Sequence, residues 1–148
     1  MREIKFRAFT DKGEMIYHFC YLSEYNHFHA EDLTNGEHSH SNIVSVMQFT
    51  GFTCDKKKKD LSAEVYEHDI FRHTGTDGDD EYSVVVWLKE RGAFYLIPVE
   101  HYPIIVDNDV SNEKEFAWLF DDAALYDFSL DVIGTKVGNV YENPELLK

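Results

Sequence analysis

The stretch EYSVVVWLKERGAFYLIPVEHY, residues 81–102, decides the fold class of this protein. Branched and aromatic residues fill positions 81–88 and again 93–102, and these residue types are enriched in β-strands. The short Arg91-Gly92 step between the two runs is typical of a β-hairpin connection. We therefore predict two antiparallel strands here, and we expect the rest of the chain to be built mainly from strands.

Further runs with strand character lie on both sides of this hairpin. Residues 3–9 alternate between apolar and basic side chains, so we expect a half-buried strand with Ile4 and Phe6 on its buried face and Arg7 on its solvent face. A Gly-containing turn at 11–13 joins it to a second strand over 15–22. The other predicted strands are 43–50, 65–72, 130–134 and 136–141.

One segment departs from the strand pattern. Asn112, with Glu115 three positions later, is a helix-start signature, and apolar residues follow at helical spacing. We predict one helix near residues 112–126. Because the helices that parallel strands need as crossovers are missing, the sequence favours a mainly β (α+β) fold with small, strongly bent antiparallel sheets or a partly open barrel. A length of 148 residues predicts a single domain over residues 1–148, with two sub-parts as an open alternative.

Charge and composition narrow the function classes. With 14 basic and 28 acidic residues the net charge is −14, which argues against nonspecific nucleic-acid binding. The basic run Lys56–Lys59 is flanked by acidic residues and indicates a solvated loop. No apolar run is long enough to span a membrane and the start lacks a signal-peptide pattern, so we expect a cytoplasmic protein without membrane contacts. Two reduced thiols are expected at Cys20 and Cys54, although a disulfide is left open.

A histidine-rich segment supplies the most specific chemical candidate. On an extended backbone, residues i and i+2 point to the same side, as two imidazoles on one metal ion require. The possible ligands are His27, His29, His38 and His40, with Glu31 or Asp32. A metal-dependent enzyme using this His27–His40 loop is therefore one alternative, but the segment lacks an HExxH element and we favour exposed histidines in a long loop.

Other site patterns fail on spacing. The acidic stretch 77–81 does not fit an EF-hand register and indicates an acidic hairpin tip instead. No GxSxG elbow or phosphate-binding glycine loop occurs, and neither cysteine has a catalytic context. Trp118 is a candidate exposed anchor for a partner. We predict no catalytic, cofactor-binding or metal-ligating residue and no cofactor, and a noncatalytic role is favoured over an enzymatic one.

Four stretches together resemble the YopX family of phage and prophage proteins. They are MREIKFRAF (1–9), VMQFTGF (46–52), VYEHDIF (65–71) and IGTKVGNVYENPELL (133–147). The sequence departs from the family pattern at His68, where relatives have a glycine, so either the turn changes type or His68 adopts a positive φ. Residues 135–137 are an insertion in the last stretch, and they leave the register of the closing strand open. The apolar residues Leu146 and Leu147 predict that the tail folds back onto a hydrophobic face.

The resemblance implies an accessory protein in the cytoplasm of a bacterial host, because family members are small phage-borne proteins. We expect it to act by binding a host or phage protein, and to form a homo-oligomer through edge strands such as 81–88. A different class of function is an acidic DNA mimic that occupies a host nucleic-acid-binding protein. Its basis is a concentration of carboxylates at Asp107, Asp109, Glu113, Glu115, Asp121, Asp122, Asp127 and Asp131.

Overall fold

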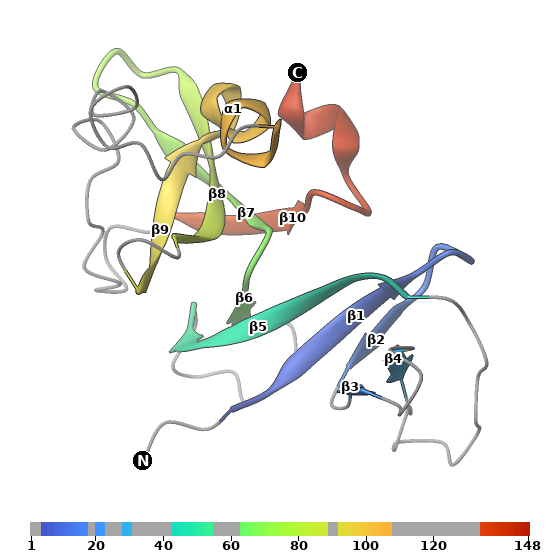
Figure 1. Ribbon diagram of the computed structural model, residues 1–148. Coiled ribbons are helices and arrows are strands. Elements are labelled where there is room, and N and C mark those ends of the chain that lie inside the picture. The colour runs from blue at the N-terminus through green and yellow to red at the C-terminus, as the bar shows by residue number, and fades with distance from the viewer. Residues whose placement is uncertain are drawn as a thin grey trace. The chain divides into compact units, whose positions relative to one another are not determined.

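The protein is mainly β, as predicted, in a computed structural model that describes residues 4–17, 20–22, 28–30, 43–54, 63–88, 92–107 and 134–148. Antiparallel strands dominate these residues, and one short α-helix accompanies them (Figure 1). The chain divides into two compact units, Met1–Gly51 and Phe52–Lys148. That the two units make a single domain stays a prediction. The predicted helix near 112–126 lies outside the described residues.

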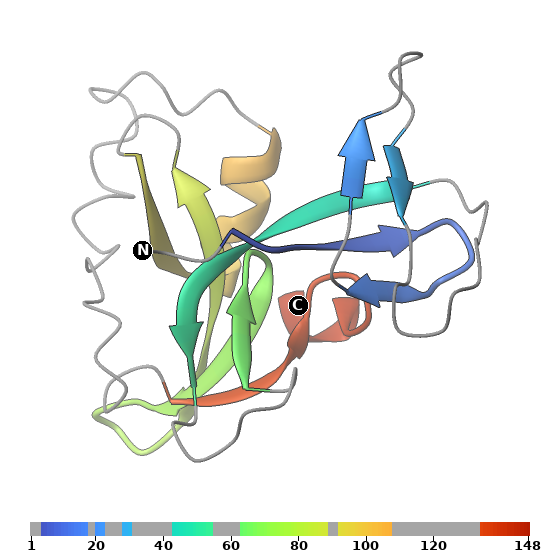
Figure 2. The same ribbon diagram turned by 90° about the horizontal axis from the view of Figure 1, so that it is seen from below.

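The first unit is organised around the antiparallel strand order β2-β1-β5 (Figure 2). The strands are β1 (Phe6–Thr10), β2 (Met15–Tyr17) and β5 (Ile43–Thr53). Ala8 is paired with Ile16 on one side and Val46 on the other, and the first two of these residues form a small buried cluster with Ile43 packed against it. The predicted hairpin between the first two strands is therefore confirmed.

Two short strands replace part of a longer predicted strand and part of a predicted loop. The predicted strand 15–22 is divided into β2 and β3 (Cys20–Leu22), and β3 pairs with β4 (Phe28–Ala30). Residues 28–30 are thus part of a strand and not of the predicted loop. Three residues with a central histidine are too short to display a period of two, which explains why the pattern was missed.

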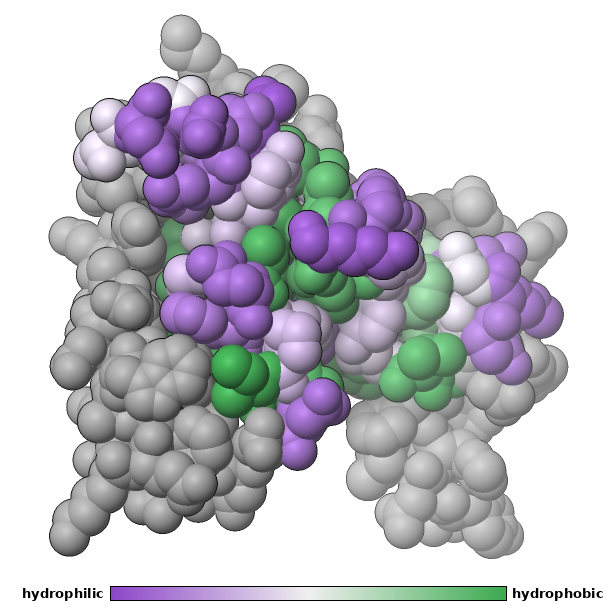
Figure 3. Space-filling model, turned by 90° about the horizontal axis from the view of Figure 1, so that it is seen from above, coloured by the Kyte–Doolittle hydropathy of each residue, from purple (hydrophilic) through white to green (hydrophobic). Residues whose placement is uncertain are grey.

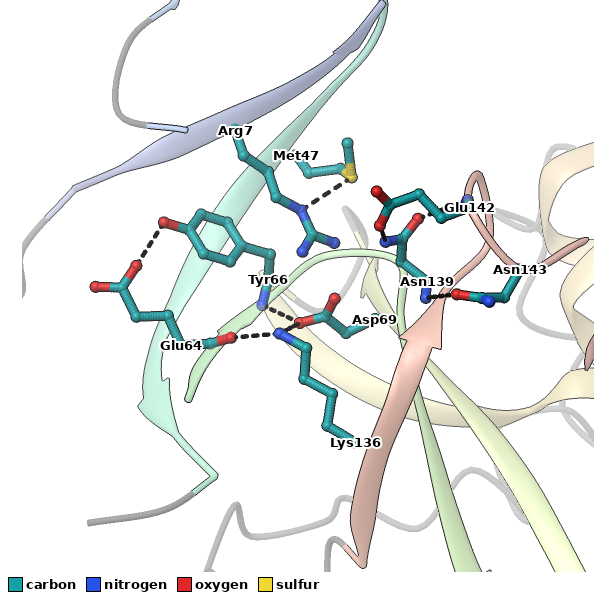
Figure 4. A network of polar contacts seen from close by, with 9 residues as sticks. All are labelled: Arg7, Met47, Glu64, Tyr66, Asp69, Lys136, Asn139, Glu142 and Asn143. Carbon is teal, nitrogen blue, oxygen red and sulfur yellow. Dashed lines mark hydrogen bonds and ion pairs between the residues drawn. The ribbon is translucent and has the colours of Figure 1, made fainter. Parts of the chain in front are cut away.

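Arg7 is buried, contrary to the prediction. It is 1 % exposed, it is paired with Met47 across β1 and β5, and its Nε donates to Met47 Sδ at 3.3 Å (Figure 4). Because β1 lies between two strands and both Arg7 and Ala8 are buried, both faces of this strand are covered. The alternation of apolar and basic side chains in the sequence predicts a strand with one buried face and one face in solvent, so it did not predict a buried Arg7. Ile4, expected on the buried face, is 71 % exposed just before the strand begins.

The second unit contains a four-stranded antiparallel sheet in the order β10-β7-β8-β9. Its strands are β7 (Asp69–Thr74), β8 (Asp80–Leu88), β9 (Ala93–Pro98) and β10 (Thr135–Asn139). The hairpin that decides the fold class is confirmed, with Val85 paired with Leu96. Since β8 lies between β7 and β9, the prediction that 81–88 is an edge strand is wrong.

Each face of this sheet carries its own hydrophobic cluster, which accounts for the unbroken apolar run in β8. One face contributes Ile70, Val84, Val86, Leu88, Tyr95, Ile97, Tyr102 and Val140. The other contributes Val65, Phe71, Val85, Phe94 and Leu96. Alternate residues of β8 therefore enter different clusters, so the strand has no solvent face along Ser83–Val86.

The second strand of the hairpin ends earlier than predicted. It stops at Pro98, and the 3₁₀-helix η1 (Val99–His101) and the helix α1 (Tyr102–Asp107) replace the expected strand residues. Proline has no N–H to donate, which limits the pairing that can follow it. Pro103 falls in the first turn of α1, where a missing N–H has no consequence.

An ion pair at the buried carboxylate of Asp69 joins three strands of the second unit (Figure 4). Asp69 begins β7 and is fully buried, and its Oδ2 accepts the backbone N–H of Tyr66, in β6 (Glu64–Tyr66), at 2.8 Å. Lys136 Nζ from β10 lies 3.0 Å from the same oxygen and also donates to the carbonyl of Glu64 at 2.8 Å. A buried carboxylate requires such partners.

A β-bulge absorbs part of the insertion that left the last strand's register open. Lys136 is paired with Phe71 and Gly138 with Ile70, so Val137 is an extra residue on β10. The bulge lets Lys136 reach Asp69 while Asn139 still pairs with Asp69 at the end of the ladder. The strand order is thereby kept despite the longer segment.

The C-terminal tail is docked, as predicted. The side-chain oxygen of Asn139 accepts the backbone N–H groups of Tyr141 at 3.1 Å and Glu142 at 3.0 Å, which turns the chain directly after β10. The 3₁₀-helix η2 (Pro144–Leu147) follows, and Leu146 and Leu147 pack against the hydrophobic cluster that contains Val140.

Replacing Lys136 with methionine tests the importance of the buried ion pair. The substitution keeps most of the side-chain volume but leaves the Asp69 carboxylate buried without its cation, so the free energy of unfolding should fall by about 3–5 kcal/mol. Urea unfolding followed by circular dichroism measures this loss. Lys12→Met, at an exposed position of the β1–β2 turn, is the matched control and should change stability little. Equal effects of the two substitutions would contradict a central role for the pair.

Candidate binding site

Most of the candidate residues from the sequence lie outside the described residues. These are His27, Glu31, Asp32, His38, His40, Lys56–Lys59 and Trp118, and only the backbone of His29 is described, in β4. Within the part of the chain that the structure describes, no group of three histidine, cysteine or acidic side chains could hold a metal ion. The metal site in the His27–His40 segment therefore stays a prediction. Cys54 is a reduced thiol packed against the Phe71 cluster.

His68 adopts the left-handed conformation that the sequence left as one of two alternatives. Its φ is 68°, and no other non-glycine residue in the described ranges has a positive φ. The turn is held from both sides, because the His68 N–H donates to the carbonyl of Val85 at 2.7 Å and the Val140 N–H donates to the carbonyl of His68 at 3.1 Å. A β-carbon costs free energy in this conformation, and its surroundings must offset that cost.

The His68 side chain contributes contacts that a glycine would lack. Its Nδ1 shares a hydrogen bond of 3.1 Å with the hydroxyl of Tyr141, and its ring lies edge-on to Tyr102 at a centroid distance of 5.8 Å. Glu67 Oε1 is 3.8 Å from Nε2. Burial raises the pKa of the Tyr102 hydroxyl well above its usual value, and the neighbouring Tyr141 and Glu67 add to this effect. The cluster connects the β6–β7 turn, α1 and the tail.

A cleft of about 410 Å³ lies where the β7–β8 hairpin meets η1. Ligand pockets in proteins begin at about 300 Å³, so the cleft is large enough for a small ligand or a single side chain of a partner. The lining residues are His73, Asp80, Glu81, Tyr82, Ser83, Pro98, Val99 and Glu100. Acidic and polar groups thus share the cleft with a few apolar ones.

The cleft arises because one face of the sheet changes from apolar to polar along the strands. Phe71 and Val85 belong to the hydrophobic cluster, whereas His73 and Ser83, two positions away on the same strands and the same face, line the cleft. The register places His73 opposite Glu81, and Ser83 opposite Pro98. The core and the cleft are therefore neighbouring parts of one sheet face.

The charges in the cleft are predominantly negative. Glu81 Oε2 lies 3.0 Å from His73 Nε2, and Arg72 on the opposite face is 3.6 Å from Asp80. Both side chains of the second pair are about half exposed, so water and salt weaken their attraction. Glu100 adds an exposed carboxylate from η1. This arrangement suits a cationic group better than an anion.

Sequence reasoning missed this cleft although one signal was present. Gly75 and Gly78 predict a turn, and the structure confirms it with Gly75 N–H donating to the carbonyl of Asp79 at 2.8 Å. Pairing the strands outward from that turn would have placed His73 opposite Glu81. The contribution of η1 had no such signal, because residues 99–101 were expected to continue a strand.

A comparison of two substitutions at His68 tests the backbone strain. Glycine and alanine both remove the imidazole contacts, but only glycine removes the β-carbon that disfavours a positive φ. His68→Gly should therefore be more stable than His68→Ala by about 1 kcal/mol. Thermal or urea unfolding of both variants measures the difference. Equal stabilities would show that the turn relaxes to another conformation.

The raised pKa of Tyr102 predicts a pH effect with a defined sign. The unfolded chain releases the Tyr102 proton above the ordinary pKa of 10.0, whereas the folded protein retains it. The free energy of unfolding therefore has its full value below that pH and falls progressively as the pH rises above it. For one proton, the free energy of unfolding should fall by up to about 1.4 kcal/mol per pH unit. Urea titrations of the wild type and Tyr102→Phe from about pH 8 to about pH 11 should show a shallower decline for the variant. Parallel declines would contradict the raised pKa.

Comparison with known proteins places the chain in a family. None of the described helices has the length and hydrophobicity needed to cross a membrane. No curated protein matches the chain. A family model described as YopX protein matches residues 5–148, which covers nearly all of the first compact unit and the whole of the second. The protein is thus a member of the YopX family.

Proposed function

We propose that this YopX-family protein is a noncatalytic phage or prophage accessory protein that binds a basic protein partner in the cytoplasm of a bacterial host. The observation that carries this proposal is the acidic surface of the β7–β8 hairpin, which extends from its exposed tip to the cleft beside η1. A net charge of −14 favours a partner of opposite charge, because complementary charge accelerates encounter and disfavours like-charged competitors.

The tip of the β7–β8 hairpin extends the negative surface beyond the cleft. The residues Asp77, Asp79, Asp80 and Glu81 are all exposed. The tip is ordered by its own hydrogen bonds, since the Asp79 N–H donates to Asp77 Oδ1 at 3.2 Å and the Gly78 N–H donates to the carbonyl of Gly75 at 3.1 Å. Figure 3 shows separate groups of hydrophilic residues on the face viewed from above, with hydrophobic residues between them. Such a surface can recruit a charged partner without a large apolar patch.

The contacts of the polar side chains support binding over catalysis. Asp69 and Lys136 stabilise the sheet, and His68 holds a turn together. The cleft does contain a serine, a histidine and a glutamate, but nucleophilic catalysis requires a hydrogen bond between nucleophile and base. No such bond joins Ser83 to His73 in the structure, where His73 Nε2 faces Glu81.

Mimicry of DNA is a second candidate that the exposed hairpin tip favours. Like the first proposal, DNA mimicry predicts a basic partner, but it also requires an extended row of carboxylates. Most of the acidic residues between 107 and 131 lie outside the described residues, and Asp107 at the end of α1 is exposed. Self-association is a separate proposal, which cannot use β8 as an edge because that strand is central.

Affinity capture with matched charge variants tests the proposed function. Tagged full-length protein is incubated with bacterial host lysate at low and high salt, and the recovered proteins are identified by mass spectrometry. The wild type should retain a basic protein that high salt releases, and Asp77→Asn with Asp79→Asn at the tip should recover several-fold less of it.

Glu14→Gln with Glu145→Gln removes the same charge at exposed positions that are not part of the hairpin and serves as the control. This control should recover the partner as the wild type does. Equal recovery by all three proteins, or recovery of no basic protein, would refute binding through the acidic hairpin.

A further inference from the structure

We infer that the cleft between the β7–β8 hairpin and η1 receives the guanidinium group of an arginine side chain from the partner protein. The inference rests on the proposed function, since it assumes a basic partner, and it adds the chemical group that is recognised and the residues that recognise it.

Two carboxylates from different elements supply the charge. Glu81 on β8 uses Oε2 toward His73, which leaves Oε1 as a further acceptor. Glu100 comes from η1 and is exposed. Asp80, the third carboxylate, is already close to Arg72. A cation that enters between Glu81 and Glu100 would form charge-assisted hydrogen bonds, which are about twice as strong as neutral ones.

The hydroxyl of Ser83 in the cleft lining is a further acceptor for a donor group. Ser83 is 4 % exposed and lines the cleft. No hydrogen bond joins its hydroxyl to another of the described residues. A ligand that carries N–H donors into the cleft can donate to this hydroxyl.

The remaining walls fit the apolar part of an arginine side chain. Pro98, which is paired with Ser83 on the cleft face, offers apolar surface for the methylene stem. Arginine also presents five N–H donors in a planar fork, which can reach several acceptors at once. A lysine ammonium is a compact point charge without this fork, and a phosphate would be repelled by the carboxylates.

Nuclear magnetic resonance titration with short peptides tests the inference on the full-length protein. The probe is acetyl-Gly-Arg-Gly-amide, and the same peptide with citrulline in place of arginine is neutral but nearly identical in shape. The arginine peptide should shift backbone amide signals of residues 73–83 and 99–101, whereas the citrulline peptide should not. Agmatine, a free small guanidinium compound, is a further arm that distinguishes a metabolite from a peptide side chain.

Variants of the lining residues assign the effect to the cleft. Glu81→Gln and Glu100→Gln should each weaken binding of the arginine peptide by about tenfold, because each removes a charge-assisted hydrogen bond. Ser83→Ala should weaken it a few-fold. Glu145→Gln, which removes an equal charge outside the cleft lining, should bind as the wild type does. Glu100 is exposed, so its variant tests the site even if Glu81→Gln does not fold.

Several results would overturn the inference. One is that the citrulline peptide shifts the same amide signals as the arginine peptide, and another is that Glu145→Gln weakens binding as much as the cleft variants do. The others are that the arginine peptide does not bind at millimolar concentration, or that agmatine binds and the peptide does not. If Glu81→Gln and Glu100→Gln still capture the basic partner from lysate while the hairpin-tip variant does not, the cleft is excluded and the proposed function survives. If all of these variants capture the basic partner as well as the wild type does, both the inference and the proposed function are refuted.

Discussion

The buried ion pair between Asp69 and Lys136 is the constraint on which the second unit depends. Asp69 is fully buried at the start of β7, so its carboxylate requires a cation and N–H donors within the protein. Lys136 supplies the cation from a strand 67 positions later in the chain, and Tyr66 supplies a backbone N–H. One oxygen atom therefore fixes β6, β7 and β10 relative to one another. The net stability gained from such a pair is small, because desolvation offsets much of the attraction.

The position of β10 in turn determines how the tail and the strained turn are held. Asn139 ends the strand and turns the chain, which directs Val140 and Tyr141 toward His68. Their contacts to the backbone and the imidazole of His68 offset the cost of a positive φ at a non-glycine residue. The histidine is therefore tolerated at this position because the docked tail stabilises it. A substitution that displaced β10 would also remove the support of the turn.

Local patterns predicted the strands well, and non-local features were missed. The hairpin of β8 and β9 and the docked tail follow from residues close together in sequence, so short-range rules suffice. The central position of β8 depends on β7 and the distant β10, which no local pattern encodes. The burial of Arg7 has the same origin, because it depends on what covers the second face of β1. The cleft was missed for a related reason, since it needs a strand register together with the helical turn after Pro98.

The location of the cleft on the sheet has a consequence for how a binding site can change within this fold. Phe71 and Val85 lie in the core, and the next residues on the same face, His73 and Ser83, line the cleft. Substitutions in the cleft therefore alter recognition at the margin of the sheet without creating a cavity in the core, and their cost in stability should be small. The strands that carry the lining are nevertheless fixed by the core beneath them. A rigid support of this kind reduces the ordering cost of binding for any ligand that enters the cleft.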